Sequence, residues 1–193
     1  MIKAIWEHAS FQMDDAAIVS PQSDAELARV LRMREQTTGQ PHFAERYLEG
    51  REFNLSLLAG DGGPQVLPPA EIDFADYPPG KPRIVGYQAK WDEQSFEYHH
   101  TPRRFVFPPA DSDLVAELSR LSIDCWHQFG LRGYARVDFR VDSANRPWIL
   151  EVNSNPCLSL DAGFAAAVEQ AGMTYDQAMD RIIRDALAHS ADL

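Results

Sequence analysis

Two oxygen-bearing side chains lie near the end of a hydrophobic run, WILEVNSNPCLSL, at residues 148–160. Glu151 and Asn153 are two residues apart, and side chains at that spacing on a β-strand share one face. A carboxylate and an amide placed side by side need water, a cationic side chain or a metal ion as a partner. The run stops at Asn155-Pro156, which is typical of a turn.

A second polar strand, YARVDFRVD at 134–142, precedes this run, and turn residues 143–146 separate the two segments. This pattern predicts an antiparallel hairpin. If Asp142 pairs with Pro147, two cross-strand pairs fall on one face of the hairpin. These pairs are Arg136 with Asn153 and Asp138 with Glu151.

Two carboxylates that face each other across a hairpin repel unless a cation lies between them. Arg136 is one candidate for that cation. A divalent metal ion is the other, because Asp138, Glu151 and Asn153 offer only oxygen ligands, which Mg²⁺ prefers. The alternative is a solvent-exposed strand face with a structural salt bridge. We favour the metal interpretation because the face ends in the rigid turn Asn-Ser-Asn-Pro, whose backbone amides are free.

The remaining elements indicate an α+β fold with mainly antiparallel sheets. Apolar residues recur at helical spacing, with capping residues at the ends, in segments 23–36, 111–130, 161–171 and 174–189. Strand-like runs cover 1–6, 42–50, 51–60 and 83–92, and a short strand is expected near Val66 in an otherwise Gly- and Pro-rich loop.

Composition narrows the class of protein. The chain has 193 residues and a formal net charge of −11, which argues against a nucleic-acid-binding surface. No apolar stretch is long enough to span a bilayer, and the N-terminus lacks the features of a signal peptide. Two cysteines do not form a disulfide framework, so we expect a cytoplasmic protein.

The hairpin motif also resembles a known family. G-Y-A-R-V-D-F followed by I-L-E-V-N-S-N-P is similar to the C-terminal lobe of the ATP-grasp ligases, above all the D-alanine–D-alanine ligase-like group. The resemblance implies ATP-grasp-type lobes, with ATP and two Mg²⁺ ions (or Mn²⁺) as cofactors. It assigns Asp138, Glu151 and Asn153 as metal ligands, and Arg136 as the group that stabilises the transferring phosphoryl group.

The resemblance extends upstream through FAERYLEGREF at residues 43–53. In the family, the corresponding segment supplies a hinge that faces the adenine and a carboxylate that binds the ribose. Two lysines also resemble family lysines that contact the phosphates. The resulting candidates for nucleotide binding are Lys3, Glu45, Arg46, Leu48, Glu52 and Lys90.

The family activity that the resemblance implies is ATP- and Mg²⁺-dependent joining of a small-molecule carboxylate to an amine through an acylphosphate. Residues 1–60 would form part of the central subdomain, and residues 61–193 would form the C-terminal lobe with the metal-binding hairpin. The family's N-terminal substrate lobe has no counterpart, so we expect a fragment or a chain that needs additional domains, a partner domain or self-association. One alternative is a non-catalytic nucleotide- and metal-binding module that acts with a partner chain. Another is a metal-dependent hydrolase, which would leave the hinge-like segment without a role.

Several residues depart from the family pattern or suggest other chemistry. Loop residues 10–13 lack a glycine, Cys157 replaces a glycine that contacts the reacting carboxyl group, and Asp161-Ala162 replaces a serine that binds the acceptor. The acid and amine substrates therefore stay open. Alternative interpretations are a nucleophilic Cys157, a metal-binding pair at His99-His100 and a phosphate contact from His8; a solvated loop residue is the simpler reading of each histidine.

Overall fold

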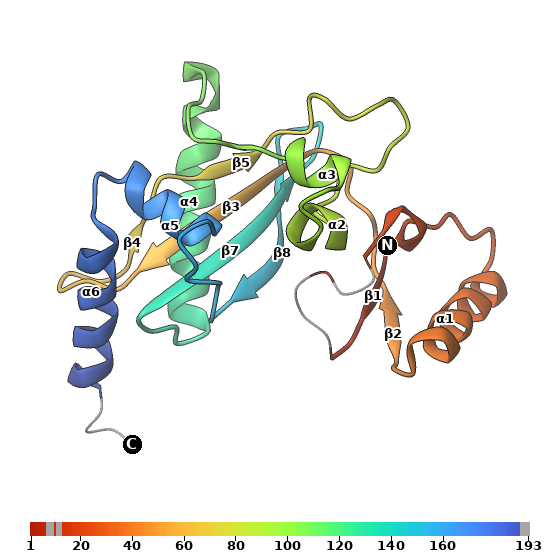
Figure 1. Ribbon diagram of the computed structural model, residues 1–193, viewed down its shortest axis with the longest axis horizontal. Helices are drawn as coiled ribbons and strands as arrows, with labels where there is room; N and C mark the ends of the chain where they lie inside the picture. Colours follow the sequence, from red (N-terminus) through yellow and green to blue (C-terminus); the bar gives the residue numbers. More distant parts are fainter. Residues whose placement is uncertain (7–9, 11–12, 190–193) are drawn as a thin grey trace. The chain divides into compact units, whose positions relative to one another are not determined.

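The computed structural model describes residues 1–6, 10 and 13–189, which belong to two compact units (Figure 1). Unit 1 contains Met1–Leu48 and Phe74–Pro102, and unit 2 contains Glu49–Asp73 and Arg103–Leu193. This division differs from the predicted boundary at residue 60. Strand β3 (Arg51–Leu58) belongs to unit 2 because it pairs with β7 (Tyr134–Val141) along its whole length. Residues 74–102 join unit 1, where Lys81 forms an ion pair with Asp15.

Unit 1 is built on a two-stranded antiparallel sheet of β1 (Ile2–Ala4) and β2 (His42–Ala44). Between these strands lie a 3-10 helix, η1 (Asp15–Ala17), and α1 (Asp24–Thr38). The predicted N-cap of α1 is present, since the Ser23 side chain accepts a hydrogen bond from the Glu26 N–H. The helix ends at Gly39, whose φ of +75° is the left-handed conformation that favours glycine.

Two strand predictions in unit 1 are wrong. The run at 42–50 is a strand only as far as Ala44, and the following residues are irregular up to β3. The run at 83–92 contains a short helix, α2 (Tyr87–Trp91), followed by α3 (Phe96–His99). Gln, Ala and Lys in α2 are good helix formers. A contact with a distant part of the chain also holds this segment in place, because the Tyr87 N–H donates a hydrogen bond to Met13 O.

Unit 2 contains a six-stranded antiparallel sheet in the order β6-β5-β3-β7-β8, with β4 paired to β3. The expected α+β class with mainly antiparallel strands is therefore confirmed. The expected strand near Val66 is β4, whereas β5 and β6 were not predicted. The bounds of the strands not yet given are β4 (Gln65–Val66), β5 (Ala70–Ile72), β6 (Arg103–Arg104) and β8 (Pro147–Asn153).

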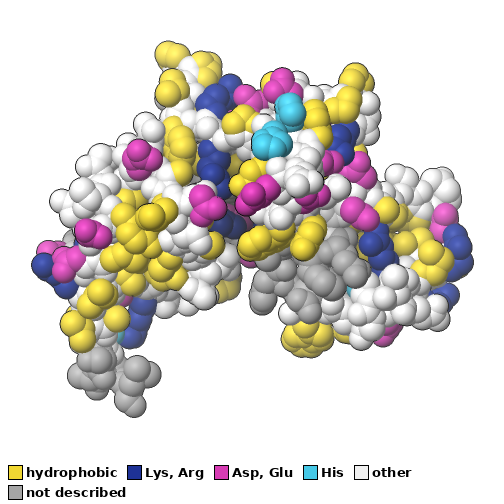
Figure 2. Space-filling model, in the orientation of Figure 1, with side chains coloured by type: hydrophobic (Ala, Val, Ile, Leu, Met, Phe, Trp, Pro, Cys, Tyr) yellow, Lys and Arg dark blue, Asp and Glu magenta, His cyan; other side chains and the backbone are white. Residues whose placement is uncertain are grey.

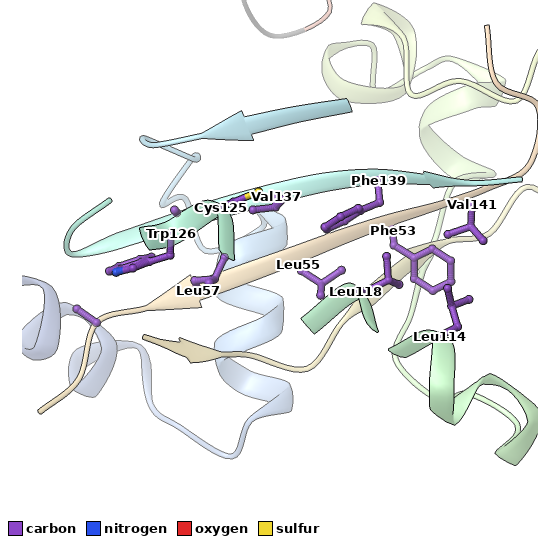
Figure 3. Packing of buried hydrophobic residues seen from close by; sticks show 12 residues of the cluster. Phe53, Leu55, Leu57, Leu114, Leu118, Cys125, Trp126, Val137, Phe139 and Val141 are labelled. Carbon is purple, nitrogen blue, oxygen red and sulfur yellow. The ribbon is translucent and has the colours of Figure 1, made fainter. Parts of the chain in front are cut away.

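One face of this sheet is apolar and packs against α4 (Ser112–Gln128), which follows the 3-10 helix η2 (Pro109–Asp111). Alternate residues of β3 and β7 supply the apolar side chains, as the period of two in a strand requires. Figure 3 shows these side chains together with those of α4. The labelled members of this core are Phe53, Leu55, Leu57, Leu114, Leu118, Cys125, Trp126, Val137, Phe139 and Val141.

The two predicted C-terminal helices are present as α5 (Gly163–Gln170) and α6 (Tyr175–Ala188). The predicted cap Thr174 forms a capping box with Gln177 at the start of α6. The helices bury a second apolar cluster that includes Phe164 and Leu58. Leu58 follows the polar residues of β3 on the same face, so this cluster closes one end of that face.

The surface agrees with the acidic composition. On the face drawn in Figure 2, Lys and Arg side chains (dark blue) are interspersed with Asp and Glu side chains (magenta). Among the residues that the structure describes, no helix combines the length and the hydrophobicity needed to cross a membrane.

Candidate functional site

The polar face of the sheet in unit 2 carries the residues that the hairpin motif predicted. Asp138 lies opposite Glu151, and Arg136 lies opposite Asn153, as expected from the sequence. Residues directly opposite in an antiparallel pair point to the same side of the sheet. Two carboxylates, an amide and a guanidinium therefore share one face.

The register near the turn differs from the prediction. Val141 pairs with Pro147 in place of Asp142, and the register shifts between Asp138 and Phe139. The shift is a β-bulge, in which β8 contributes one extra residue, so the pairs beyond it are displaced by one residue relative to those near the turn. The polar pairs are nevertheless the predicted ones, because the extra residue in the bulge offsets the one-residue difference in pairing at the turn.

Asp138 is held on the polar face by three hydrogen bonds from two residues. Its carboxylate accepts hydrogen bonds from Arg136 Nε at 2.6 Å and Arg136 Nη2 at 2.8 Å. The side-chain amide of Asn54, which lies opposite Asp138 on β3, donates to the same carboxylate at 2.9 Å. Asp138 is only 8% exposed, so these donors compensate for the water that the carboxylate loses.

Glu151 is exposed, and no described residue donates a hydrogen bond to its carboxylate or forms an ion pair with it. It nevertheless acts on Arg136 through its charge. Burial alone would lower the pKa of Arg136, but the charge and hydrogen bonds of Asp138, and the charges of Glu151 and Glu52, raise that pKa above its ordinary value. Arg136 is therefore a permanent cation beside these carboxylates.

Glu52 and Arg140 form a second ion pair on the polar face, with Arg140 Nη2 and Glu52 Oε2 2.8 Å apart. Both side chains are nearly buried. Arg140 Nη1 also donates to Gly50 O at 3.0 Å, which ties the start of β3 to β7. The predicted ribose ligand Glu52 is thus held in place by a neighbouring strand.

The three predicted metal ligands fit a hard divalent cation in their chemistry. Asp138, Glu151 and Asn153 present only oxygen ligands, which suit Mg²⁺. Asn153 Oδ1 accepts one hydrogen bond, from Asn155 N–H at 3.0 Å, and its second lone pair is left for another partner. Across the described part of the chain, no three His, Cys, Asp or Glu side chains cluster as a metal site. A cation here would need non-protein ligands to complete its shell, as Mg²⁺ sites commonly do.

The other predicted nucleotide-binding residues belong to unit 1. Lys3 on β1 forms an ion pair with Glu45, with Nζ and Oε1 2.6 Å apart, so two of them are in contact. Arg46 and Leu48 follow Glu45 in the irregular segment between β2 and β3. Lys90 lies on helix α2, which corrects the expectation that the run at 83–92 around it is a strand.

The structure adds little support for the alternative interpretations of Cys157 and the histidines. Cys157 is exposed and its Sγ lies 3.2 Å from Ser159 Oγ, and no described histidine forms a hydrogen bond with it. His99 and His100 each contact a backbone carbonyl, that of Glu93 and that of Phe96 respectively. The candidate His8, with most of the loop around it, lies outside the described residues.

Three further polar residues of this face were not predicted. Asn54 could have been found from the alternation of polar and apolar residues in REFNLSLL. Extending the hairpin register by two residues would have placed Tyr134 opposite Asn155. In the structure Asn155 lies just past the end of β8, and the Tyr134 hydroxyl donates a hydrogen bond to its Oδ1.

Comparisons with known proteins agree with these features. A family model described as "D-ala D-ala ligase C-terminus" matches residues 17–184. The D-alanine–D-alanine ligase of Synechococcus sp. (strain JA-3-3Ab) is 33% identical over 150 residues, which cover 77% of this chain and 42% of the relative. The D-alanine–D-alanine ligase of Halorhodospira halophila is 29% identical over 187 residues, covering 97% of this chain and 54% of the relative.

Solved structures show the same fold. The D-alanine–D-alanine ligase of Coxiella burnetii superposes with a TM-score of 0.70 at 18% identity, covering 99% of this chain and 45% of that protein. The Bacillus anthracis ligase complexed with ATP superposes with a TM-score of 0.63 at 21% identity, covering 100% of this chain and 60% of that protein. The chain thus spans about half the length of the relatives that it matches.

Proposed function

Because the chain belongs to the family described as "D-ala D-ala ligase C-terminus", we propose that it is the ATP-binding part of a carboxylate–amine ligase. The similar Bacillus anthracis ligase has been solved with ATP, which supports a nucleotide as the ligand. The chain's net charge of −11 would repel a triphosphate, so cations at the site are part of the proposal.

In this proposal, two Mg²⁺ ions are bound by Asp138, Glu151 and Asn153. Mn²⁺ could take the place of Mg²⁺. Divalent cations bound there would neutralise charge on the phosphates during phosphoryl transfer. Arg136 stabilises the transferring phosphoryl group, and it is the only one of these four residues that carries a positive charge. Its bond to Asp138 orients the guanidinium before any ligand arrives.

The nucleotide itself would be bound by the residues that the family resemblance assigns. The backbone around Arg46, between Glu45 and Leu48, would face the adenine, and Glu52 would bind the ribose. Lys3 and Lys90 would contact the phosphates. The ion pair between Lys3 and Glu45 supports placing these two in one functional group, because they are already in contact in unit 1.

The reaction proposed for the whole protein is joining of a small carboxylate to an amine. ATP would phosphorylate the carboxylate, and the amine would displace phosphate from the acylphosphate to give an amide or peptide-type bond. The chain's residues would act by positioning and electrostatic stabilisation, with no protein nucleophile. Because the chain covers about half of its relatives, turnover would need additional domains or a partner chain.

The observation that carries this proposal is the pairing of Asp138 and Glu151 across β7 and β8, beside Arg136. We expect Mg²⁺ with ATP to raise the melting temperature of the chain, because a ligand that binds the folded state stabilises it. Glu151→Ala should abolish that rise, while circular dichroism shows an intact fold. Glu169→Ala, which removes an exposed glutamate on α5, is the matched control and should leave the rise unchanged.

The outcomes of this experiment separate the assignments. A wild-type chain without any response to Mg²⁺ and ATP would contradict nucleotide binding. A full response in Glu151→Ala would contradict the metal ligand assignment alone. The second candidate function is a non-catalytic nucleotide- and metal-binding module that acts with a partner chain. It predicts the same stabilisation, but no ADP release by the full-length protein when amino acids are added in combination, whereas a ligase would release ADP with its own substrates.

A further inference from the structure

The polar face continues past the two pairs that contain the proposed catalytic and metal-binding residues, Asp138–Glu151 and Arg136–Asn153. Tyr134, Arg136 and Asp138 alternate along β7, so they point to the same side of the sheet. The hydrogen bond from the Tyr134 hydroxyl to Asn155 Oδ1 continues the ladder, just past the end of β8. Tyr134 and Asn155 therefore lie next to the Arg136–Asn153 pair.

Asn155 in turn fixes the side chain of Asn153. The backbone N–H of Asn155 donates to Asn153 Oδ1 at 3.0 Å. A backbone nitrogen can only donate, so its partner must be the carbonyl oxygen of the Asn153 amide rather than the nitrogen. The orientation of the Asn153 amide is thereby set, with its oxygen toward the turn.

We propose that Tyr134 and Asn155 are positioning residues that hold the Asn153 side chain ready to bind a divalent cation. The inference rests on the proposed function, because it takes Asn153 as a metal ligand. The Tyr134 hydroxyl holds the Asn155 side chain, and the Asn155 backbone holds the Asn153 oxygen. Partners of this kind orient a ligand, and their loss typically weakens metal binding by about 10–100-fold.

Both ends of this connection are anchored. The Tyr134 ring packs edge-to-face on Phe164, with centroids 5.4 Å apart, and Phe164 is fully buried. Gly133, the preceding residue, donates its N–H to Asp185 Oδ2 on α6 at 2.8 Å. On the other side, Pro156 follows Asn155 and is buried. The hydroxyl and the turn are therefore brought together by rigid parts of unit 2.

The tyrosine hydroxyl has a role that ring packing does not explain. A phenylalanine at position 134 could make the same contact with Phe164. Burial, and the nearby Cys157 and Tyr175, raise the pKa of Tyr134 above its ordinary value, so the hydroxyl keeps its proton at neutral pH. The described hydrogen-bond partner of the Tyr134 hydroxyl is Asn155, so the hydroxyl stabilises the turn next to Asn153.

The test is a Mg²⁺ titration of the whole chain at saturating ATP, in which the rise in melting temperature is measured at each Mg²⁺ concentration. Tyr134→Phe and Asn155→Ala each break the connection, and each should raise the Mg²⁺ concentration at half-response about 10-fold. Saturating Mg²⁺ should restore the wild-type response, which a merely structural defect would not allow. Asn153→Ala is the reference for loss of the ligand, and Tyr98→Phe, on an exposed tyrosine of unit 1, is the control.

A double variant tests whether the two residues act together. If they form one connection, Tyr134→Phe combined with Asn155→Ala should shift the midpoint no further than either change alone. Additive shifts, or an unchanged midpoint in both single variants, would overturn the proposal. If Tyr134→Phe did not fold, Asn155→Ala would decide the question, because its side chain is exposed.

A metal-free measurement separates this inference from the proposed function. Cys157 is exposed two residues beyond Asn155, whereas Cys125 is buried, so a thiol reagent should report on the turn. We expect faster labelling of Cys157 in Tyr134→Phe than in the wild type. Faster labelling with an unchanged Mg²⁺ midpoint would overturn the positioning role. A wild-type chain without a Mg²⁺ response would overturn the proposed function and, with it, this role.

Discussion

Arg136 and Asp138 form a two-bond ion pair although they are neighbours on the same face of one strand. Their side chains are 19% and 12% exposed, so the pair is shielded from water but open to a ligand. Asp138 thus already has a cationic partner in Arg136. Glu151, across the hairpin, has no ion pair with a described residue, so its carboxylate is available to bind a metal ion. Single substitutions on the polar face can therefore test which charges stabilise the fold and which bind a cation.

Arg136→Met should destabilise the fold by about 1–3 kcal/mol, because among the described residues it leaves the Asp138 carboxylate with Asn54 as its one donor. Partial exposure of the pair keeps the loss below that of a fully buried charge. Urea unfolding at neutral pH measures the change. We also expect Mg²⁺ without nucleotide to stabilise the variant more than the wild type, because a cation replaces the lost guanidinium.

The matched control for that experiment is Arg184→Met, which breaks the exposed pair between Arg184 and Asp180 on α6. Pairs of this kind contribute less than about 1 kcal/mol. Equal stabilisation of wild type and Arg136→Met by Mg²⁺ would show that the cation does not bind at this face.

The charge network at the other edge of the sheet gives a second prediction. Glu71 is nearly buried and accepts two hydrogen bonds from Arg51 and one from Arg104. Glu71→Gln should therefore lower the free energy of unfolding by about 1–3 kcal/mol, the range for hydrogen bonds to charged groups. Glu117→Gln, which removes an exposed partner of Arg120, should leave stability nearly unchanged. Comparable effects of the two changes in denaturant titrations would contradict this distinction.

The sequence predicted the parts of the fold that follow local periodicity. Strand β3, helix α4 and the β7–β8 hairpin were found because their polar and apolar residues alternate at the strand or helix period. The short helix α2 was missed because its five residues are fixed by a contact with Met13, which is distant in the sequence. A local pattern cannot show such a contact.

The site shows the same division. The sequence placed Asp138 opposite Glu151 by counting from an expected Asp142–Pro147 pair. Counting from the observed Val141–Pro147 pair would place Asp138 opposite Leu150, and the β-bulge restores the expected opposition. The β-bulge depends on how β8 accommodates one extra residue, which no local pattern indicates. Likewise, the pairing of Glu52 with Arg140 requires knowing that β3 lies beside β7.

The hairpin turn should make stability depend on acid. Asp142 accepts a hydrogen bond from the backbone N–H of Arg146, and further bonds from Trp148 Nε1, the Arg146 side chain and the Ala144 N–H. These bonds lower the pKa of Asp142 from its ordinary value of 3.8 to about 2, against a smaller effect of burial. A carboxylate with a lowered pKa stabilises the fold above its unfolded pKa. That stabilisation is lost as the pH falls from about 4 to about 2.

Asp142→Asn should therefore be less stable than the wild type at neutral pH, and the difference should shrink over that acidic range. Unfolding measured at several pH values checks this, and the Asp142 carboxyl carbon resonance should titrate near pH 2. Asp161→Asn, which changes an exposed aspartate after the hairpin, is the control. If the difference in free energy of unfolding between wild type and Asp142→Asn stayed constant from neutral to acidic pH, the ionised Asp142 carboxylate would not be the form that stabilises the turn.

The last prediction concerns Gly50, where the chain enters β3. Its φ is +152°, and a Cβ built there would lie 2.0 Å from Val141 O on β7. The neighbour is backbone of a strand that pairs with β3 and with β8 at this residue, so it cannot move aside as a side chain could. Gly50→Ala should therefore lower the free energy of unfolding by about 2 kcal/mol or more. Gly62→Ala, at a position with no atom within 4 Å of the added Cβ, should be nearly neutral.

The same change has a consequence for the proposed nucleotide site. Gly50 O accepts a hydrogen bond from Arg140, and Arg140 holds the carboxylate of Glu52. Displacing the backbone at Gly50 should disturb Glu52 even in molecules that stay folded. ATP affinity of the Gly50→Ala protein, measured calorimetrically well below its melting temperature with excess Mg²⁺, should fall, whereas the Mg²⁺ midpoint should stay near the wild-type value. Unchanged ATP affinity in a destabilised Gly50→Ala chain would show that Glu52 does not bind the nucleotide.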